Sequence, residues 1–241
     1  MRHLPPRPAL PVASVRRLTA KTKLIEDATD RPGTAIRIYT SSRQAKWFEP
    51  ITDALKAMAG PGERCMFCSG SESSQVEHFR PKAIFPLRAM EWENLFWTCG
   101  ICNQSKGDRF PPDTEVGEMV IDPTTENVWE FFFVDEFGNL TERWQDGIND
   151  VDQRARTTVR ILSLDRDALQ QSRQLRLQDL KEKARDALIL LAHELITIED
   201  LRQRINGWKL QPIQPDVADY FLQGPGSNEQ PFADLLAKVN P

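Results

Sequence analysis

Two short stretches, Cys65-Met66-Phe67-Cys68 and Cys99-Gly100-Ile101-Cys102, contain every cysteine of this 241-residue chain. Two residues between the cysteines of a pair let one tight turn present both sulfurs to a single ion. The spacing therefore predicts a tetrahedral four-thiolate zinc site. Because a closed shell of four thiolates leaves no position for water or substrate, we expect this zinc to be structural.

Two other uses of the cysteines compete with zinc. A pair of disulfides is disfavoured if the protein is cytoplasmic, and a thioredoxin-like redox motif needs only one pair in a βα context. The first six residues lack the apolar core of a signal peptide, and the chain has no run of about eighteen apolar residues. These features predict a cytoplasmic protein without a membrane span.

The formal net charge of −4 hides a gradient along the chain. Residues 1–60 carry 11 Lys and Arg against 5 Asp and Glu, residues 61–112 carry 6 against 6, and residues 113–241 carry 14 against 24. Phosphate contacts need a basic surface, which only the first quarter of the chain supplies. We therefore do not expect the chain to bind nucleic acid tightly by itself, and a partner protein would supply additional affinity.

Periodicity divides the chain into three segments: an N-terminal helical extension (1–60), a cysteine-bearing module (61–112) and a hairpin followed by helices (113–241). The Pro-rich residues 5–11 should be extended. Apolar spacing and turn signals predict helices over 15–27, 42–58, 150–164, 165–198 and 232–239, with strands over 128–134 and 140–144. A break is expected near Ser163–Asp165, and Thr197 resembles a helix start. The expected class is α+β.

The residues threaded through the cysteine pairs are specific. Val76-Glu77-His78-Phe79-Arg80-Pro81-Lys82 and Trp92-Glu93-Asn94-Leu95 lie between the pairs, and Asn103-Gln104-Ser105-Lys106 follows the second. From Cys65 to about Pro112 this arrangement resembles the HNH endonuclease, or ββα-metal, motif. The resemblance implies a zinc-stapled β-hairpin and helix that hydrolyse nucleic-acid phosphodiester bonds.

Roles follow from that resemblance one residue at a time. Glu77 and Asn103 match the protein ligands of a catalytic divalent metal, and their oxygen donors suit Mg²⁺ or Mn²⁺. His78 matches the general base that activates water. Asn94 matches the residue that braces the hairpin loop, and Lys106 would face the phosphate.

The chain departs from the commonest HNH pattern at both metal positions, where Asp and His are usual. Glu77 is one methylene longer, so the metal would lie further from the hairpin backbone. Asn103 is neutral, which leaves one protein charge on the ion and predicts weak metal affinity without substrate.

A wider set of residues resembles the HNH component of Septu-type and retron-associated anti-phage systems. The set comprises Glu77 to Lys82, Trp92 to Leu95, Lys106 to Pro111 and, more loosely, Ile121-Asp122-Pro123, Phe133 to Leu140 and Ile161 to Arg166. That family implies a nuclease controlled by an ABC-like ATPase partner, with nucleic acid, DNA in preference to RNA, as the substrate.

Simpler interpretations remain for each residue. His78 could be a buried core histidine, Asn103 a helix cap and Asn94 a turn residue, while Lys106 could be a solvated charge. The whole module could be a non-catalytic zinc site that binds nucleic acid or a protein. The helices after residue 150 could pack within the chain, against a partner or in a homo-oligomer.

Overall fold

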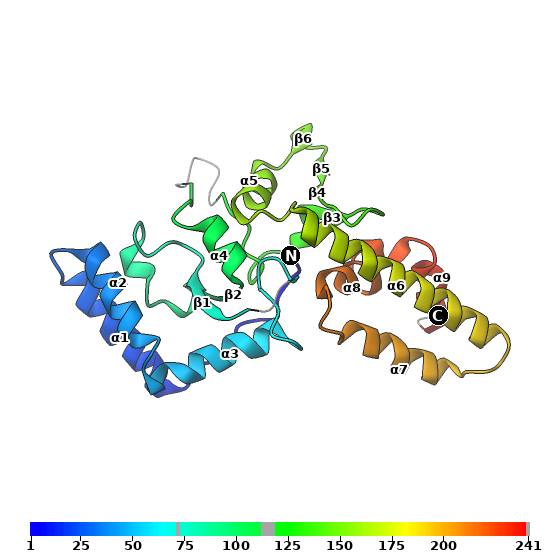
Figure 1. The fold of residues 1–241 in the computed structure, drawn as a ribbon, viewed down its shortest axis with the longest axis horizontal. Helices are drawn as coiled ribbons and strands as arrows, with labels where there is room; N and C mark the ends of the chain where they lie inside the picture. Colours follow the sequence, from blue (N-terminus) through cyan, green and yellow to red (C-terminus); the bar gives the residue numbers. More distant parts are fainter. Residues whose placement is uncertain (71–72, 112–118, 240–241) are drawn as a thin grey trace.

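The computed structural model describes residues 1–70, 73–111 and 119–239. Figure 1 shows the N-terminal helices on one side, a small ββα unit in the middle and the C-terminal helices on the other side. The helices are α1 (Val12–Glu26), α2 (Arg31–Ser42), α3 (Glu49–Ala59), α4 (Gly100–Lys106), α5 (Gln153–Leu162), α6 (Asp167–Ala192), α7 (Ile198–Lys209), α8 (Pro215–Leu222) and α9 (Phe232–Val239). The strands are β1 (Gln75–His78), β2 (Leu95–Thr98), β3 (Phe132–Val134), β4 (Leu140–Glu142), β5 (Trp144–Gln145) and β6 (Asp150–Val151). The predicted α+β class is confirmed.

Helix α2 was missing from the sequence prediction, which left residues 28–41 without an element. The Asp30 side chain caps this helix by accepting from the Gly33 backbone N–H at 2.9 Å. Pro32 lies in the first turn, where the N–H that proline lacks would have no helical partner anyway. Residues that resemble a turn in the sequence therefore form a helix start. The helix predicted over 42–58 is correspondingly shorter, because α3 begins at Glu49.

Strands β1 and β2 form an antiparallel pair in which Gln75 lies opposite Thr98 and His78 opposite Leu95. Every residue of β2 is buried, which fits its unbroken sequence of Leu, Phe, Trp and Thr. The backbone passes from β2 directly into α4, whose N-cap is Cys99. This short connection places the second cysteine pair at one end of the strands and His78 at the other.

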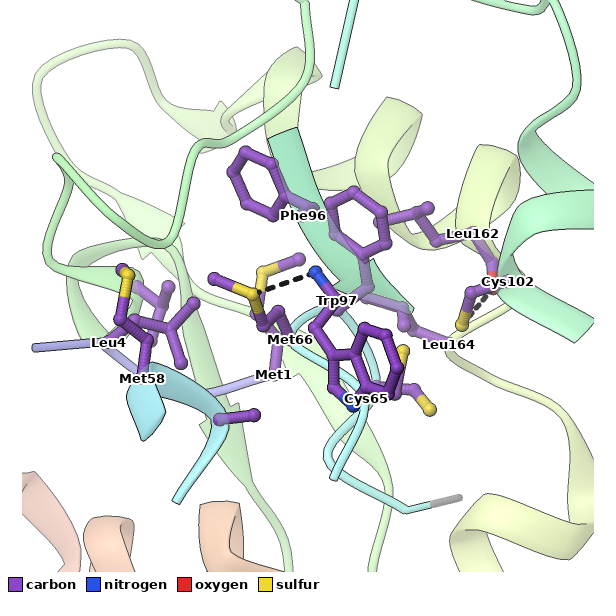
Figure 2. Close-up of a cluster of buried hydrophobic side chains, with 14 of the residues drawn as sticks. Met1, Leu4, Met58, Cys65, Met66, Phe96, Trp97, Cys102, Leu162 and Leu164 are labelled. Atoms are coloured by element: carbon purple, nitrogen blue, oxygen red, sulfur yellow. Dashed lines mark hydrogen bonds between the residues drawn. The ribbon is translucent and has the colours of Figure 1, made fainter. Parts of the chain in front are cut away.

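A cluster of aromatic rings fills the centre of the ββα unit. The Phe96 ring of β2 packs against both Phe67 and Phe79, with centroid distances of 5.1 and 5.3 Å, and those two rings lie 6.5 Å from each other. Figure 2 shows Phe96 and Trp97 among buried side chains that come from the N-terminal segment, the first cysteine turn and the α5–α6 junction. The unit is therefore packed into the rest of the chain on both sides.

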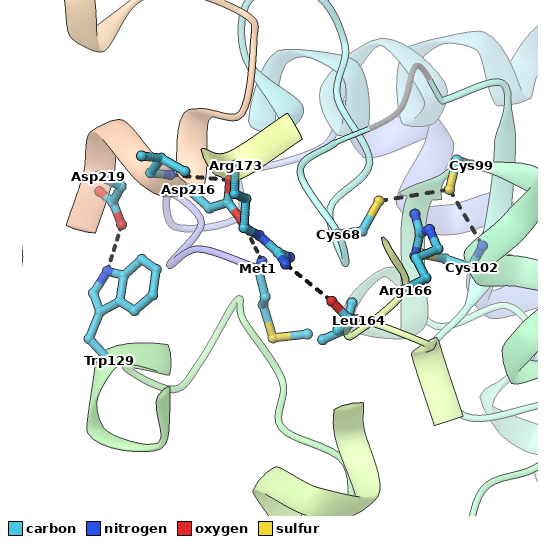
Figure 3. Close-up of polar contacts among 11 residues, drawn as sticks. Met1, Cys68, Cys99, Cys102, Trp129, Leu164, Arg166, Arg173, Asp216 and Asp219 are labelled. Carbon is cyan, nitrogen blue, oxygen red and sulfur yellow. Dashed lines mark hydrogen bonds and ion pairs between the residues drawn. The ribbon is translucent and has the colours of Figure 1, made fainter. Parts of the chain in front are cut away.

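The N-terminal segment is extended, as predicted, and it crosses the molecule. Met1 and Leu4 are buried, and the Arg7 guanidinium donates to the Leu95 carbonyl at 2.9 Å. The N-terminal ammonium lies 3.1 Å from Asp216, which also accepts from Arg173 at 3.0 Å (Figure 3). This segment ties the β1–β2 loop to the C-terminal helices.

The C-terminal half follows the prediction in part: the helix predicted over 165–198 ends at Ala192, and α8 was not predicted. Strands β3 and β4 form the expected hairpin. The helical structure is interrupted between α5 and α6 at Ser163, which adopts a left-handed conformation. Thr197 and Asp200 form a capping box that starts α7. Helix α5 begins later than predicted, because residues 150 and 151 pair with β5.

In the part of the chain that the structure describes, no helix is both long and apolar enough to span a membrane. The division of the chain after residue 60 stays a prediction, and the predicted boundary after residue 112 lies outside the described residues.

Candidate metal centre and active site

The four cysteines come together as a buried cluster. All four are free thiols, and their sulfur atoms lie within 4.8 Å of one another. The Sγ atoms of Cys68 and Cys99 are 3.9 Å apart, and Cys99 Sγ accepts from the Cys102 backbone N–H (Figure 3). Among the described residues this is the one cluster of three or more His, Cys, Asp or Glu side chains able to hold an ion.

The donor set and its spacing fit a structural zinc ion. Zn–S bonds of about 2.3 Å place the sulfurs of a tetrahedron about 3.8 Å apart, close to the observed separation. Burial raises the pKa of the Cys65 thiol, whereas hydrogen bonds from the other three thiols lower the pKa of Cys68. Four thiols packed together in a buried place lose all their protons only when a cation balances the charge.

The junction between α5 and α6 covers this cluster. The Leu162 carbonyl oxygen lies 3.8 Å from Cys102 Sγ (Figure 2), and Arg166 Nη1 lies 4.0 Å from the same sulfur. Burial acts to lower the pKa of Arg166, but the charges of Cys68 and Cys102 outweigh it and raise the pKa. Arg166 thus supplies positive charge beside the thiolates, from a segment more than sixty residues away in sequence.

At the other end of the ββα unit, His78 is fully buried (0% exposed). Its Nε2 lies 2.9 Å from the Ala89 carbonyl oxygen, so Nε2 carries the proton and donates to that oxygen. Nδ1 is then left with its lone pair and has no hydrogen-bond partner among the described residues. Glu77 Oε1 lies 3.6 Å from His78 Nδ1, beyond hydrogen-bond distance.

The pKa values of Glu77 and Lys106 are both shifted from those of free side chains. Burial acts to raise the pKa of Glu77, but interactions with His78 and the charge of Lys82 outweigh it and lower the pKa to about 2. Burial lowers the pKa of Lys106 to about 8, although the charge of Glu77 opposes this shift. The Lys106 ammonium donates to the Gly107 carbonyl at 3.1 Å.

Asn94 clamps the loop that joins β1 to β2. Its Oδ1 accepts from the Arg80 backbone N–H at 2.7 Å, and its Nδ2 donates to the Arg80 and Arg88 carbonyls at 3.0 and 2.9 Å. The Arg88 carbonyl is one peptide before Ala89, whose oxygen holds His78. Asn94 therefore fixes both ends of the loop that orients the imidazole.

Asn103 lies on α4 and donates from Nδ2 to Gln75 Oε1 at 2.6 Å. Gln75 is two residues before Glu77 on the same strand, so both side chains lie on the same face of β1. Asn103 and Gln75 also line an open hollow beside the N-terminus of α4. The amide oxygen Oδ1 of Asn103 is the atom that remains for a ligand.

Two residues of this region were not singled out from the sequence. The ring of Tyr39, on α2, packs edge to face against His78 with a centroid distance of 4.3 Å, and its hydroxyl donates to the Val76 carbonyl. The second is Arg166. Arg166 ends the Ile161–Arg166 stretch of the resemblance, but nothing in the sequence placed either residue against its partner, because each reaches it from a distant segment.

No known family model matches the chain. Over 132 residues it is 31% identical to the Septu protein PtuB of Bacillus thuringiensis. The matched stretch covers 52% of this chain and 46% of that protein. The chain is thus similar to a Septu protein over about half the length of each.

Proposed function

We propose that the chain is a metal-dependent HNH endonuclease in which His78 is the general base. The observation that carries this proposal is the hydrogen bond from His78 Nε2 to the Ala89 carbonyl, at 2.9 Å. It leaves Nδ1 buried, without a hydrogen-bond partner and 3.6 Å from the Glu77 carboxylate. A buried polar atom without a partner costs free energy, and an active site is one place where that cost is retained.

In the proposed reaction, Nδ1 accepts a proton from water as the water oxygen attacks phosphorus. One P–O ester bond breaks, and the leaving oxygen takes a proton from solvent. The products are a phosphomonoester and an alcohol. His78 is covered by Tyr39, so substrate reaches Nδ1 only when the side chains over the imidazole move aside.

Glu77 and Asn103 would hold the catalytic metal, through the carboxylate and through amide Oδ1. Both are oxygen donors, which fit Mg²⁺ or Mn²⁺. When bound, such an ion stabilises the charge that develops on phosphate oxygens. Gln75 contributes by holding the Asn103 amide nitrogen, which presents the amide oxygen to the ligand side.

The similarity to a Septu protein supports a role in anti-phage defence. We propose that an ABC-like ATPase works with this chain, as in the systems that its motifs resemble. The −10 balance of residues 113–241 fits a surface that does not bind nucleic acid and leaves the helical half for a protein partner.

The test is cleavage of plasmid DNA and of total RNA with Mg²⁺, with Mn²⁺ and with EDTA. Wild type is compared with His78→Ala, Asn103→Ala and the control His193→Ala, whose side chain is exposed at the end of α6. Each is assayed with and without an added ABC-like ATPase of the kind proposed as the partner. We expect metal-dependent cutting that falls by about 10²–10⁴-fold in His78→Ala and is unchanged in His193→Ala.

The second candidate is a non-catalytic zinc module, and the complete burial of His78 favours it. A zinc-loaded, folded protein that cuts neither substrate, even with the ATPase, would establish this alternative. Equal cutting by wild type and His78→Ala would also remove His78 from the mechanism.

A further inference from the structure

Three cations from separate elements lie near Tyr39 or Glu77. Arg43 is the C-cap of α2, Lys82 lies on the loop after β1, and Lys106 ends α4. Lys106 is fully buried, whereas Arg43 is exposed and Lys82 is half-buried. Arg43 and Lys82 are therefore the two that an external molecule can reach.

Arg43 and Lys82 each contact Tyr39. Lys82 Nζ lies 5.3 Å from the centroid of the Tyr39 ring. Arg43 follows Tyr39 by one helical turn, and its backbone N–H donates to the Tyr39 carbonyl at 3.0 Å. Burial and the charge of Glu77 raise the pKa of Tyr39, and the charge of Arg43 opposes them.

Several other cations of the N-terminal helices already have partners. Lys23 forms ion pairs with Glu26 and Asp27 at 3.1 and 3.0 Å, and Arg17 lies over the Trp47 ring. Among the described residues, neither Arg43 nor Lys82 forms an ion pair with a carboxylate. These two charges are thus available for an anion outside the chain.

We propose that Arg43 and Lys82 bind backbone phosphates of a nucleic acid, next to the phosphodiester that His78 attacks. This inference rests on the proposed nuclease function, and it assigns a substrate-binding role to the N-terminal helices. The +6 balance of residues 1–60 is the only strongly basic segment of the chain, and α2 places one end of it beside the imidazole. A phosphate backbone satisfies both cations and also supplies the bond to be cut.

Binding is measured by fluorescence anisotropy of a labelled 30-base-pair duplex and a labelled 30-nucleotide single strand over a series of salt concentrations. The His78→Ala variant serves as the background, so that cleavage does not interfere. Arg43→Gln/Lys82→Gln is compared with Lys181→Gln/Arg185→Gln, which makes the same charge change on α6, on the far side of the ββα unit (Figure 1). We expect the first pair to weaken binding by roughly 10-fold or more and to reduce the salt slope by about 2, and the α6 pair to change binding less than about 2-fold.

Unfolding temperatures of the variants are measured alongside, so that a misfolded protein is not mistaken for lost contacts. Equal effects of the two pairs, or no effect of either, would overturn the inference. Wild-type cleavage is assayed separately. Loss of binding in the Arg43/Lys82 pair, with no cleavage by wild type, would support the phosphate subsite and refute the nuclease function.

Discussion

The two ends of the ββα unit are built in opposite ways. At the cysteine end, every sulfur faces the same point and the α5–α6 junction closes over it with a carbonyl and a guanidinium. At the histidine end, an imidazole nitrogen is buried without a partner and a lysine is buried beside a carboxylate. The first end gathers four sulfurs around one point beneath a cover, and the second buries titratable groups beside one another.

This contrast separates structure from function on physical grounds. Unpaired buried groups cost stability and persist where activity needs them. We therefore expect changes at the cysteine end to destroy the fold and changes at the histidine end to alter activity while stability holds or rises.

The largest expected effect is loss of the zinc site. Cys68→Ser removes one of four ligands, and the remaining thiols in the buried cluster no longer hold the ion tightly. We expect about one zinc per wild-type chain and a fall of more than about 10 °C in the unfolding temperature of the variant. Metal analysis and thermal unfolding measure both quantities. A wild-type chain that unfolds at the same temperature with and without zinc would contradict a structural role.

Removing the buried ammonium of Lys106 should raise the stability of the folded chain, the reverse of the effect of Cys68→Ser. The pKa of Lys106 is about 8 in the folded chain against 10.5 for a free lysine, so the unfolded chain binds the proton more strongly. The penalty on folding is full below pH 8 and disappears as the pH rises to 10.5. Lys106→Met should therefore raise the free energy of unfolding at pH 7 by up to about 3 kcal/mol, and the gain should vanish near pH 10.5.

Thermal unfolding of wild type, Lys106→Met and the charge-preserving control Lys106→Arg at pH 7, 8 and 10 tests this difference. If Lys106 acts on the phosphate, Lys106→Met also loses cleavage while it gains stability. A variant that is less stable at every pH would show that Lys106 has an ordinary structural role.

Substituting Arg166 tests whether the C-terminal half contributes to the metal affinity of the cysteine cluster. Arg166→Ala removes a positive charge 4.0 Å from Cys102 Sγ. Partners of metal ligands are typically worth 10–100-fold in metal affinity, so zinc should pass to a competing chelator 10–100-fold more readily. Arg160→Ala, on the exposed face of α5, is the matched control. Equal release from both variants would mean that the guanidinium does not stabilise the site.

Local patterns in the sequence predicted the cysteine end well. The cysteine cluster, the β3–β4 hairpin, the break at Ser163 and the Thr197 cap depend on spacing and turn residues that act within a few positions. The roles of Glu77, His78, Asn94, Asn103 and Lys106 came from motif resemblance and stay predictions, although the clamp that Asn94 makes fits its expected bracing role.

What the sequence did not predict depends on long-range packing. Tyr39 meets β1 from 37 residues away, and Arg166 meets Cys102 from 64 residues away. No periodicity carries such information. Helix α2 was missed for a local reason, since the proline and glycine of its first turn are also the commonest turn residues.

The smallest expected effect concerns Tyr39, the residue of α2 whose ring packs against His78 at the histidine end. Tyr39→Phe keeps the ring against His78 and loses only the hydrogen bond to the Val76 carbonyl, whereas Tyr39→Leu also removes the ring contact. A positioning role predicts a several-fold fall in kcat for Tyr39→Phe, a larger fall for Tyr39→Leu, and little change in KM for either. The pH profile of kcat should shift in Tyr39→Leu, because the environment of the imidazole changes, and stay in place in Tyr39→Phe. A different outcome is that both variants lose stability and activity in proportion and that their pH profiles of kcat do not shift. Tyr39 would then have only a packing role, and the histidine end would be as structural as the cysteine end.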